Sequence, residues 1–462
     1  MMALLKNLKL NYITDKNILK TFSQNYGGPF HQPLAIVEPV NQQDIINLVV
    51  WANCHKIPLA VKGFGHSTGK QQEALQGIMI NIRTLNQIRG ISFNGEGESI
   101  IDVDSGVSWK ELIDYTLAHN KIPYVITDWL LLTVGGTLCL GGIGAASFRY
   151  GLQADYLSEA SIVTKEGELY TASPSQNHKL FDAIRGGLGQ FGVVTALKIR
   201  LTQSPQSCLV HKIIYTNLNQ FIKDSFTLLK KQNLNGIIAH FECNIESTIK
   251  KRLGTHYKKL NKNAISQAKW LAILELTQFK FDTLKVKPLT DNLKSDLIFT
   301  DEYKIKDYLY RIPPILDSNL EKNSVQHTEC TLFFPYNEKT LELISYFLDQ
   351  LNYEILGYGT ILFVPMNNSA IQSPYFIRPA SKQFFLFGIL SRHLNDQAST
   401  QFNKLIDDFY KKSLAIGACR YPCDSLVTTD WPRHFGSKWE EFQALKRTFN
   451  PNNIYSPGLS IP

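Results

Sequence analysis

Residues that could bind or act on a ligand gather around three glycine-rich segments in the first half of this 462-residue chain. The first is GFGHS at 63–67, which follows an apolar run at 59–61 that predicts a strand. Glycines in such a turn let several backbone N–H groups point toward one anion, as phosphate binding requires. Taken alone, the segment fits an ordinary tight turn better than a binding loop.

The second segment, 135–151, holds six glycines in seventeen residues. This density is too high for the interior of a helix or a strand. A surface loop would expose apolar side chains such as Leu138 and Phe148. We therefore predict a buried loop whose backbone lies close to a ligand.

The third segment, GLGQFG at 187–192, matches the pattern GxGxxG, but its surroundings exclude a nicotinamide dinucleotide site. That site needs a strand before the glycines, a helix after them and an acidic residue about 20 positions further on. Here a helical pattern at 178–186 comes first, a strand pattern at 193–201 follows, and 203–223 contains no Asp or Glu. Three such turns still predict a large phosphorylated cofactor. FAD fits, because its pyrophosphate binds backbone amides while its ring system makes apolar contacts.

One carboxylate could exchange a proton with a substrate beside this cofactor. Asp128 lies between Thr127 and Trp129 and is followed by leucines at 130–132. Desolvation in an apolar setting raises the pKa of a carboxylate, which suits it to accept a proton. From these residues alone, an Asp that caps the turn before the leucines is the simpler interpretation.

The elements that must position these residues alternate between strand and helix patterns. Apolar residues at 34–37 predict a strand, and Asn41 can cap a helix whose apolar residues recur at helical spacing as far as Ala52. Beyond Pro205 the chain is richer in Lys, Asn, Phe and Tyr and lacks glycine clusters. Its patterns there predict a helix at 338–351 and strands at 330–335, 361–365 and 384–390.

This order of elements favours an α+β fold over a regular βαβ repeat. The change in composition predicts a two-part FAD-binding domain with a separate mixed-sheet substrate domain. We place the FAD-binding domain at 1–203, the substrate domain at 204–414 and a C-terminal return to the FAD-binding domain at 415–462.

Composition narrows the class of protein further. The net charge is +8, but the Lys residues are scattered, so we expect no nucleic-acid partner. The seven cysteines form no CxxC pair, which fits a reducing compartment. The N-terminal residues lack the sustained apolar core of a signal peptide, and no apolar run is long enough to span a membrane. We expect a cytoplasmic enzyme without a membrane partner and without a metal site.

Several ordered segments resemble the FAD-linked oxidases of the vanillyl-alcohol oxidase type, which have a PCMH-type FAD-binding domain. Among these the chain is most similar to the cytokinin dehydrogenases. The similarity covers about 30–203 and 425–462 well, and fragments such as HFE at 240–242 carry it between them. The segments that carry it are GFGHS at 63–67, TDWLLLTVGGTL at 127–138, GIGAASFRYGLQ at 142–153, LFDAIRGGLGQFGVVT at 180–195 and WPRHFGSKWEEFQALKRTFNPNNIYSPG at 431–458.

The resemblance implies roles for individual residues. His66 becomes the point of covalent attachment to the 8α-methyl carbon of the flavin. Some relatives have a second tether, a cysteine just before the TVGG stretch, but leucines occupy 130–132 here, so a single tether is expected and Cys139 is expected to be a packing residue. Asp128 becomes the catalytic acid-base, and Glu242 becomes a second acidic residue at the ring end of the substrate. The residues expected to bind FAD are Gly63, Phe64, Gly65, His66, Ser67, Thr127, Asp128, Thr133, Gly135, Gly136, Thr137, Gly142, Gly189, Val193, Val194, Tyr455 and Ser456.

The activity implied by this resemblance is oxidation of the secondary amine of an N6-isoprenoid adenine to an imine, which hydrolyses to adenine and an aldehyde. A quinone-like molecule or oxygen would accept the electrons. One alternative is an oxidase of the same fold that acts on a sugar or alcohol, in which Asp128 would need a histidine or lysine partner. Another is a flavin-binding protein without turnover.

Overall fold

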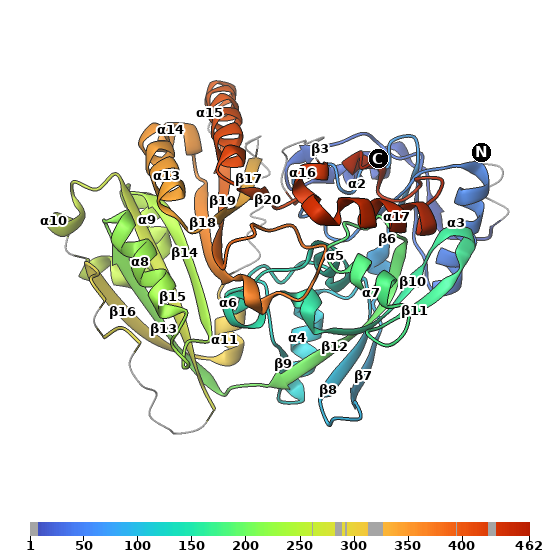
Figure 1. Cartoon of the computed structure of the whole chain (residues 1–462), viewed down its shortest axis with the longest axis horizontal. Coiled ribbons are helices and arrows are strands. Elements are labelled where there is room, and N and C mark those ends of the chain that lie inside the picture. Colours follow the sequence, from blue (N-terminus) through green and yellow to red (C-terminus); the bar gives the residue numbers. More distant parts are fainter. Residues whose placement is uncertain are drawn as a thin grey trace.

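The structure, a computed structural model, describes residues 8–260, 262–281, 289–291, 293–312, 327–393, 395–423 and 431–462. They form two lobes that lie side by side in Figure 1. The first lobe contains the described residues up to 204 and those from 431 onward, and the second lobe contains those from 205 to 423. Helices occur with both parallel and antiparallel strands, so the predicted α+β class is confirmed.

A four-stranded sheet in the first lobe leads into the first glycine segment. Its order is β1 (Tyr12–Ile13), β4 (Ala35–Val37), β6 (Ile78–Asn81) and β5 (Leu59–Lys62), and β4 and β5 both pair parallel to β6. Asn41 caps α3 (Gln42–His55), as predicted, by accepting a hydrogen bond from the backbone of Asp44 at 3.0 Å. Because Ile45 and Leu48 of α3 share a core with β5, the chain leaves the sheet at a fixed place. The short elements α2 (Lys16–Phe22), β2 (Gln24–Asn25) and β3 (Gly28–Pro29) lie between β1 and β4 in sequence.

A second, six-stranded antiparallel sheet completes the first lobe. Ser108 and Glu111 form a capping box at the start of α4 (Trp109–Ala118). The third glycine segment lies between α7 (His178–Ile184) and a long strand, which is the helix-then-strand order predicted from the sequence. The strands are β11 (Leu169–Ala172), β10 (Leu157–Val163), β12 (Val193–Gln203), β8 (Ser99–Asp104) and β7 (Ile88–Phe93), with β9 (Lys121–Pro123) also paired to β12.

The second lobe is built on an eight-stranded sheet. The predicted strands at 330–335, 361–365 and 384–390 all belong to it. We expected this sheet to be mixed, but every pairing described between its strands is antiparallel, and the parallel pairs lie in the four-stranded sheet instead. The strand order is β16 (Leu297–Lys304), β13 (Ser207–Tyr215), β15 (Trp270–Lys280), β14 (Gly236–Cys243), β18 (Thr360–Asn367), β19 (Gln383–Arg392), β17 (His327–Pro335) and β20 (Cys419–Arg420).

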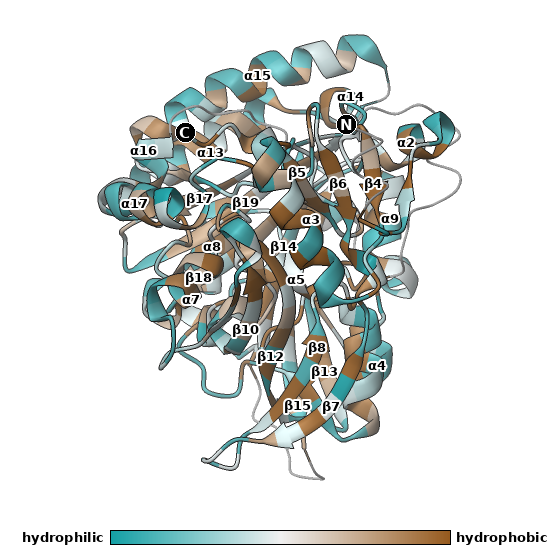
Figure 2. Cartoon of the chain, turned by 90° about the vertical axis from the view of Figure 1, so that its right-hand side faces the viewer, coloured by the Kyte–Doolittle hydropathy of each residue, from teal (hydrophilic) through white to brown (hydrophobic). Residues whose placement is uncertain are grey.

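Alternation along these strands sends side chains to two different cores. On β13, Ile213 packs with the helices on the outer face, whereas Val210 faces the first lobe. The outer face is covered by α8 (Leu218–Leu228), α13 (Glu338–Gln350) and α15 (Asp396–Ala415), and α15 shows a largely hydrophilic outer surface in Figure 2. The inner face is left to form one wall of a space between the lobes. Shorter helices of this lobe are α9 (Glu246–Leu253), α10 (Lys262–Ile265), α11 (Ile305–Leu309) and α14 (Tyr353–Leu356).

The second glycine segment differs from its prediction. We expected a loop, but its first residues form a short helix, α5 (Val134–Leu140), and a second short helix, α6 (Ser147–Tyr150), follows. Thr133 caps α5 by accepting a hydrogen bond from Gly136 N at 3.3 Å. A Cβ atom on Gly135 would lie 2.6 Å from that of Ser105, so the helix carries glycine where the neighbouring chain comes close. The expected burial holds, because Leu138 and Phe148 are buried.

The end of the chain returns to the first lobe through α16 (Trp431–Phe435) and α17 (Trp439–Phe449), drawn in red beside the first-lobe elements in Figure 1. The ring of Phe442 packs against Phe191, with the two centroids 5.0 Å apart. The backbone N–H of Ser456 then donates to the carbonyl of Leu59 on β5 at 2.9 Å. The tail therefore lies next to the strand that carries the first glycine segment.

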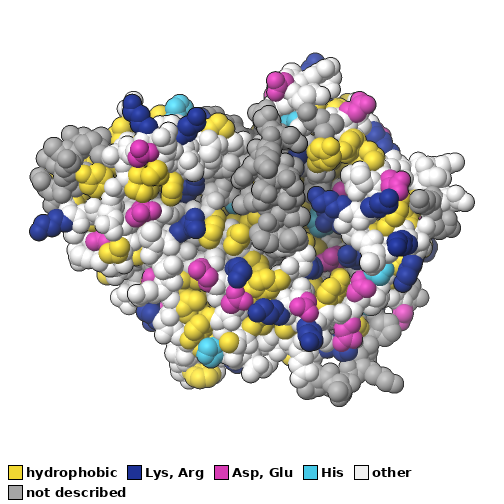
Figure 3. Space-filling model, turned by 180° about the vertical axis from the view of Figure 1, so that it is seen from behind, with side chains coloured by type: hydrophobic (Ala, Val, Ile, Leu, Met, Phe, Trp, Pro, Cys, Tyr) yellow, Lys and Arg dark blue, Asp and Glu magenta, His cyan; other side chains and the backbone are white. Residues whose placement is uncertain are grey.

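The surface gives no sign of one concentrated basic patch on the face seen in Figure 3, where Lys and Arg lie among acidic and hydrophobic side chains. Within the described residues, no helix has both the length and the apolar character needed to cross a membrane.

Candidate active site

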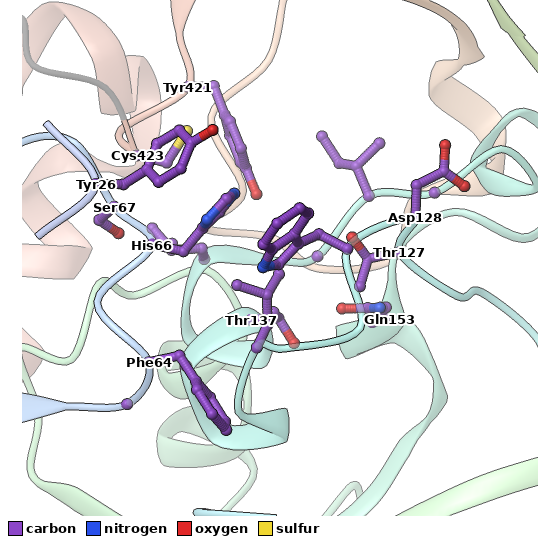
Figure 4. Close-up of a pocket in the computed structure, with 18 of the residues that line it drawn as sticks. Tyr26, Phe64, His66, Ser67, Thr127, Asp128, Thr137, Gln153, Tyr421 and Cys423 are labelled. Atoms are coloured by element: carbon purple, nitrogen blue, oxygen red, sulfur yellow. The ribbon is translucent and has the colours of Figure 1, made fainter. Parts of the chain in front are cut away.

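A cavity of about 820 Å³ lies between the two lobes. All three glycine segments line it, and so does the inner face of the eight-stranded sheet. Such a volume is at the upper end of the range for ligand pockets, which suits a large cofactor together with a substrate. Figure 4 shows Phe64, His66 and Ser67 on one backbone segment of the cavity, with Thr127 and Asp128 across the view from them.

The structure brings most of the predicted site residues to this one cavity. Val193 and Tyr455 do not line it, because their side chains belong to the buried core around α3. Glu242 does not line it either. Those that line it are Gly63, Phe64, Gly65, His66, Ser67, Thr127, Asp128, Thr133, Gly135, Gly136, Thr137, Gly142, Gly189, Val194 and Ser456.

Glycine is required where these segments approach one another. A Cβ atom on Gly63 would lie 2.4 Å from the Thr133 hydroxyl. The first glycine segment therefore lies directly against the start of the second. Gly142 has φ +74°, a value that side chains disfavour, and its Cβ would lie 2.0 Å from Oε1 of Gln153. Close backbone approach is therefore part of how the cavity is built.

His66 lies in an aromatic setting at the end of the segment that follows β5. Its ring is stacked on Trp129 with the centroids 5.3 Å apart, and it lies 4.7 Å from the ring of Tyr26. Burial, and then the positive charge of Arg392, lower the pKa of His66 to about 4. Its imidazole is therefore neutral at physiological pH, with a nitrogen lone pair available to form a bond.

Polar atoms without protein partners show that a polar ligand fits here. Gln153 is 1% exposed and lines the cavity, and neither its Oε1 nor its Nε2 has a hydrogen-bond partner among the described residues. The hydroxyl of Ser105, also at the cavity, lacks a partner within the same part of the chain. Buried polar groups are rarely left unpaired, so this wall fits the polar edge or phosphates of FAD. The sequence did not mark either residue as a site residue, although Gln153 is the last residue of the family-like segment 142–153.

Asp128 has a charged partner that the sequence did not reveal. Its Oδ1 lies 3.1 Å from Nη2 of Arg311, and the same guanidinium lies 2.8 Å from Oε1 of Glu275. The expected apolar setting was therefore incomplete. Burial lowers the pKa of Arg311, but the carboxylates of Asp128 and Glu275 outweigh this and hold it well above the usual value. The arginine is a permanent cation between two carboxylates.

Glu242 is engaged by other protein groups and does not line the cavity. It is 5% exposed, and its Oε1 accepts from Nε of Arg252 at 2.8 Å and from the hydroxyl of Thr360 at 2.9 Å. Arg252 itself lines the cavity. In the structure the carboxylate therefore contacts a cavity-lining arginine, whereas the resemblance implied direct contact with the substrate.

His240, two residues before Glu242 and therefore on the same face of β14, does line the cavity. Its pKa is held well below the usual value by burial first, and then by the positive charges of Arg252, Arg311 and Lys212. It is therefore a neutral imidazole on the wall formed by the second lobe.

Two thiols also line the cavity. Burial raises the pKa of Cys139 to about 12, so it stays protonated and is a poor nucleophile, in keeping with a packing role. The Sγ of Cys423 lies 3.5 Å from Oε1 of Glu329.

Solved structures with the same fold confirm the architecture. The BBE-like 1 protein of Physcomitrella patens superposes with a TM-score of 0.76 at 16% identity, and the match covers 99% of this chain and 98% of that chain. A variant of that protein, D396N, gives the same TM-score at 15% identity. These matches show that the chain has the fold of that protein.

Family models identify the chain further. One described as "FAD binding domain" matches residues 33–173, and one described as "Cytokinin dehydrogenase 1, FAD and cytokinin binding" matches residues 205–461. The second model matches more than half of the length of this chain. The chain therefore belongs to the cytokinin dehydrogenase family and is an FAD-dependent oxidoreductase. The predicted resemblance is confirmed.

Individual relatives agree with this assignment. An uncharacterized oxidoreductase, ORF5 in the fasciation locus of Rhodococcoides fascians, is 28% identical over 97% of this chain and 98% of its own length. Cytokinin dehydrogenase 5 of Arabidopsis thaliana is 28% identical over 93% of this chain and 84% of its own. Cytokinin dehydrogenase 4 of Oryza sativa subsp. japonica is 29% identical over 93% and 86%.

Proposed function

We propose that this chain oxidises the secondary amine of N6-isoprenoid adenines. The observation that carries the proposal is the placement of Asp128 on the wall of the cavity that also holds the three glycine segments. Arg311 holds one oxygen of this carboxylate, and no other hydrogen-bond or ion-pair partner of Asp128 occurs among the described residues. Its second oxygen is thus available to a substrate N–H.

The reaction removes a hydride and a proton from the amine, which together amount to two electrons and two protons. The C–H bond next to the nitrogen breaks with its electron pair as a hydride, and the N–H proton passes to Asp128, which leaves a C=N double bond. FAD, when bound, supplies the two-electron acceptor. Water then adds to the imine carbon, and the C–N bond breaks to release adenine and an aldehyde.

The cofactor would be held by the glycine segments, with Gln153 and Ser105 supplying polar partners. We propose further that His66 carries the flavin covalently. A neutral imidazole can act as a nucleophile, and the lowered pKa of His66 keeps the ring neutral. We propose a quinone-like molecule or oxygen as the acceptor that takes the electrons onward.

A sugar or alcohol oxidase is the competing function. Deprotonation of a hydroxyl calls for a histidine or lysine beside Asp128 that can accept a proton. The partner found there is Arg311, which cannot accept one. This observation supports the amine over the hydroxyl as the reacting group.

Anaerobic mixing tests the proposal. The holoenzyme is mixed with isopentenyladenine without oxygen, and the flavin absorbance is followed while adenine is measured by chromatography. We expect the flavin to bleach and one adenine to form per flavin. Bleaching by a sugar or alcohol and not by the purine would assign the competing function. No bleaching by either would support a flavin protein without turnover.

A further inference from the structure

We propose that Arg311 is a positioning residue that holds Asp128 in the orientation needed to receive the substrate N–H. The inference rests on the proposed role of Asp128, and it adds a residue from the second lobe to the reaction. Arg311 and Asp128 are 183 positions apart in sequence and meet only because the two lobes pack together.

The guanidinium of Arg311 is fixed from several sides before it reaches Asp128. Nε donates to Oε1 of Glu275 at 3.0 Å, and Nη2 lies 2.8 Å from the same oxygen. Nη1 donates to the carbonyl of Tyr308 at 3.3 Å, and the guanidinium carbon lies 4.2 Å from the centroid of the Tyr308 ring. The hydroxyl of Tyr308 is itself 2.9 Å from that of Thr277. An arginine held in this way loses little freedom when it binds a further carboxylate.

The segment that carries Arg311 is also fastened to the first lobe. The Tyr310 hydroxyl donates to Asp114 of α4 at 2.6 Å, and Lys306 of α11 lies 3.7 Å from the same carboxylate. Asp128 follows α4 in sequence and belongs to the same lobe. The distance between Arg311 and Asp128 is therefore set by contacts on both sides of the cavity.

The charges explain why an arginine is needed. Asp128 and Glu275 both lie within 3.1 Å of the one guanidinium. Without a cation between them, two carboxylates this close would repel each other, and one would turn away or take up a proton. Because both carboxylates already neutralise Arg311, it does not serve as a receptor for an anionic substrate. Its effect on a substrate passes through Asp128.

Chemical rescue tests this role. Single-turnover reduction of the flavin by isopentenyladenine is measured in wild type, R311A and R311K at saturating substrate. We expect R311A to lower the limiting rate about 100-fold, since displacement of a reacting group by about 1 Å costs this much. R311K keeps the charge but not the planar fork and should lose about tenfold. Guanidinium chloride, compared with sodium chloride at equal ionic strength, should raise the rate of R311A about tenfold.

A matched control is provided by Arg89, which also joins two carboxylates. It lies 2.8 Å from Asp102 and 2.6 Å from Asp104 on β8 but does not line the cavity. R89A should keep the wild-type rate, and guanidinium should not change it. A crystal structure of R311A should show Asp128 turned away from its wild-type orientation or in several orientations.

The outcomes separate this inference from the proposed function. If wild type is not reduced by the purine, the proposed function fails, and the crystal structure of R311A alone decides whether Arg311 orients Asp128. If wild type is reduced and R311A is equally fast, the inference is overturned while the function stands. A slow R311A that guanidinium does not restore, with Asp128 unmoved in its crystal structure, shows a purely structural role and also overturns it.

Discussion

The substitution E242Q distinguishes between two roles for an acidic residue that the sequence assigned to the substrate. The structure predicts that E242Q lowers stability and leaves flavin reduction close to that of wild type. Oε1 of Glu242 lies 2.8 Å from Nε of Arg252 and 2.7 Å from its Nη2, and the substitution removes the negative charge that these groups share. The side chain of Glu242 is 6% exposed and that of Arg252 is 26% exposed.

The size of the effect follows from these exposures. Breaking a fully buried ion pair costs about 3–5 kcal/mol, whereas an exposed pair contributes about 0–1 kcal/mol. With one buried and one partly exposed partner, and with hydrogen bonds to the new amide still available, we expect a loss of about 2 kcal/mol. For an unfolding unit the size of the second lobe, this lowers the thermal midpoint by about 4–8 °C.

Thermal unfolding of the holoenzyme and purine-driven flavin reduction are measured on the same preparations. E246Q serves as the control, because Glu246 lies on α9, the helix that carries Arg252, and forms an exposed pair with Lys250. It should leave the midpoint unchanged. Our reasoning would be refuted if E242Q kept the wild-type midpoint and its KM for isopentenyladenine rose about tenfold or more. A tenfold rise in KM corresponds to the loss of a hydrogen bond of about 1.4 kcal/mol, and it would show that Glu242 contacts the substrate.

Four further predictions concern the cofactor. H66A should bind FAD without a covalent bond, so its acid-precipitated pellet is colourless while the wild-type pellet is yellow; a yellow H66A pellet would move the attachment elsewhere. Because the pKa of His66 is about 4, the rate of covalent FAD incorporation into the apoprotein should be constant from about pH 8 to about pH 6. The rate should fall only as the pH approaches 4, when the imidazole gains a proton. A fall in rate centred near pH 6.5 would contradict the lowered pKa. In the H66A background, Q153L should weaken FAD binding about tenfold in a fluorescence titration, because leucine cannot form the hydrogen bonds that the Gln153 amide offers to FAD. Equal affinities of H66A and the double variant for FAD would exclude a contact between Gln153 and the cofactor. G142A should lose bound flavin, because its Cβ would lie 2.0 Å from Oε1 of Gln153, whereas G254A, also at positive φ but in open space, should keep it; equal flavin content in the two variants would argue against close packing at Gly142.

Local signals in the sequence predicted the elements well. Asn41 caps a helix because its side chain accepts the hydrogen bond that a helix start leaves open, and this needs only neighbouring residues. The alternating and continuous apolar runs became strands for a similarly local reason. The reversed order around 187–192 was also readable, since the helix before it and the strand after it each have their own pattern.

The structure differs from the sequence-based expectations where distant segments decide the conformation. The segment that contains Gly135 forms the helix α5, which Thr133 caps, and glycine is needed at this position because Ser105 lies too close for a Cβ atom. Neither the cap nor the close approach can be recognised from the glycine content of the segment. The resemblance assigned Glu242 to the substrate, but Arg252 on the helix that follows β14 folds back to engage it. Val193 and Tyr455 stand next to cavity residues in sequence yet point into the core.

Arg311 shows the same limit most clearly. It lies in the second lobe, where the resemblance to known enzymes is faint, and nothing in its immediate sequence marks it as a partner of Asp128. Only the packing of α11 between the eight-stranded sheet and α4 brings the two side chains to 3.1 Å. The charge environment of a site built between two lobes therefore had to come from the structure.

The central claim is that Asp128 takes the proton when an N6-isoprenoid adenine is oxidised. Anaerobic single-turnover reduction of the flavin by isopentenyladenine, compared between wild type and D128N, tests it most directly, because asparagine keeps the shape but cannot act as a base. We predict that the limiting rate of D128N falls about 10²–10⁴-fold while bound flavin is unchanged. A D128N enzyme that reduces its flavin as fast as wild type would contradict the account.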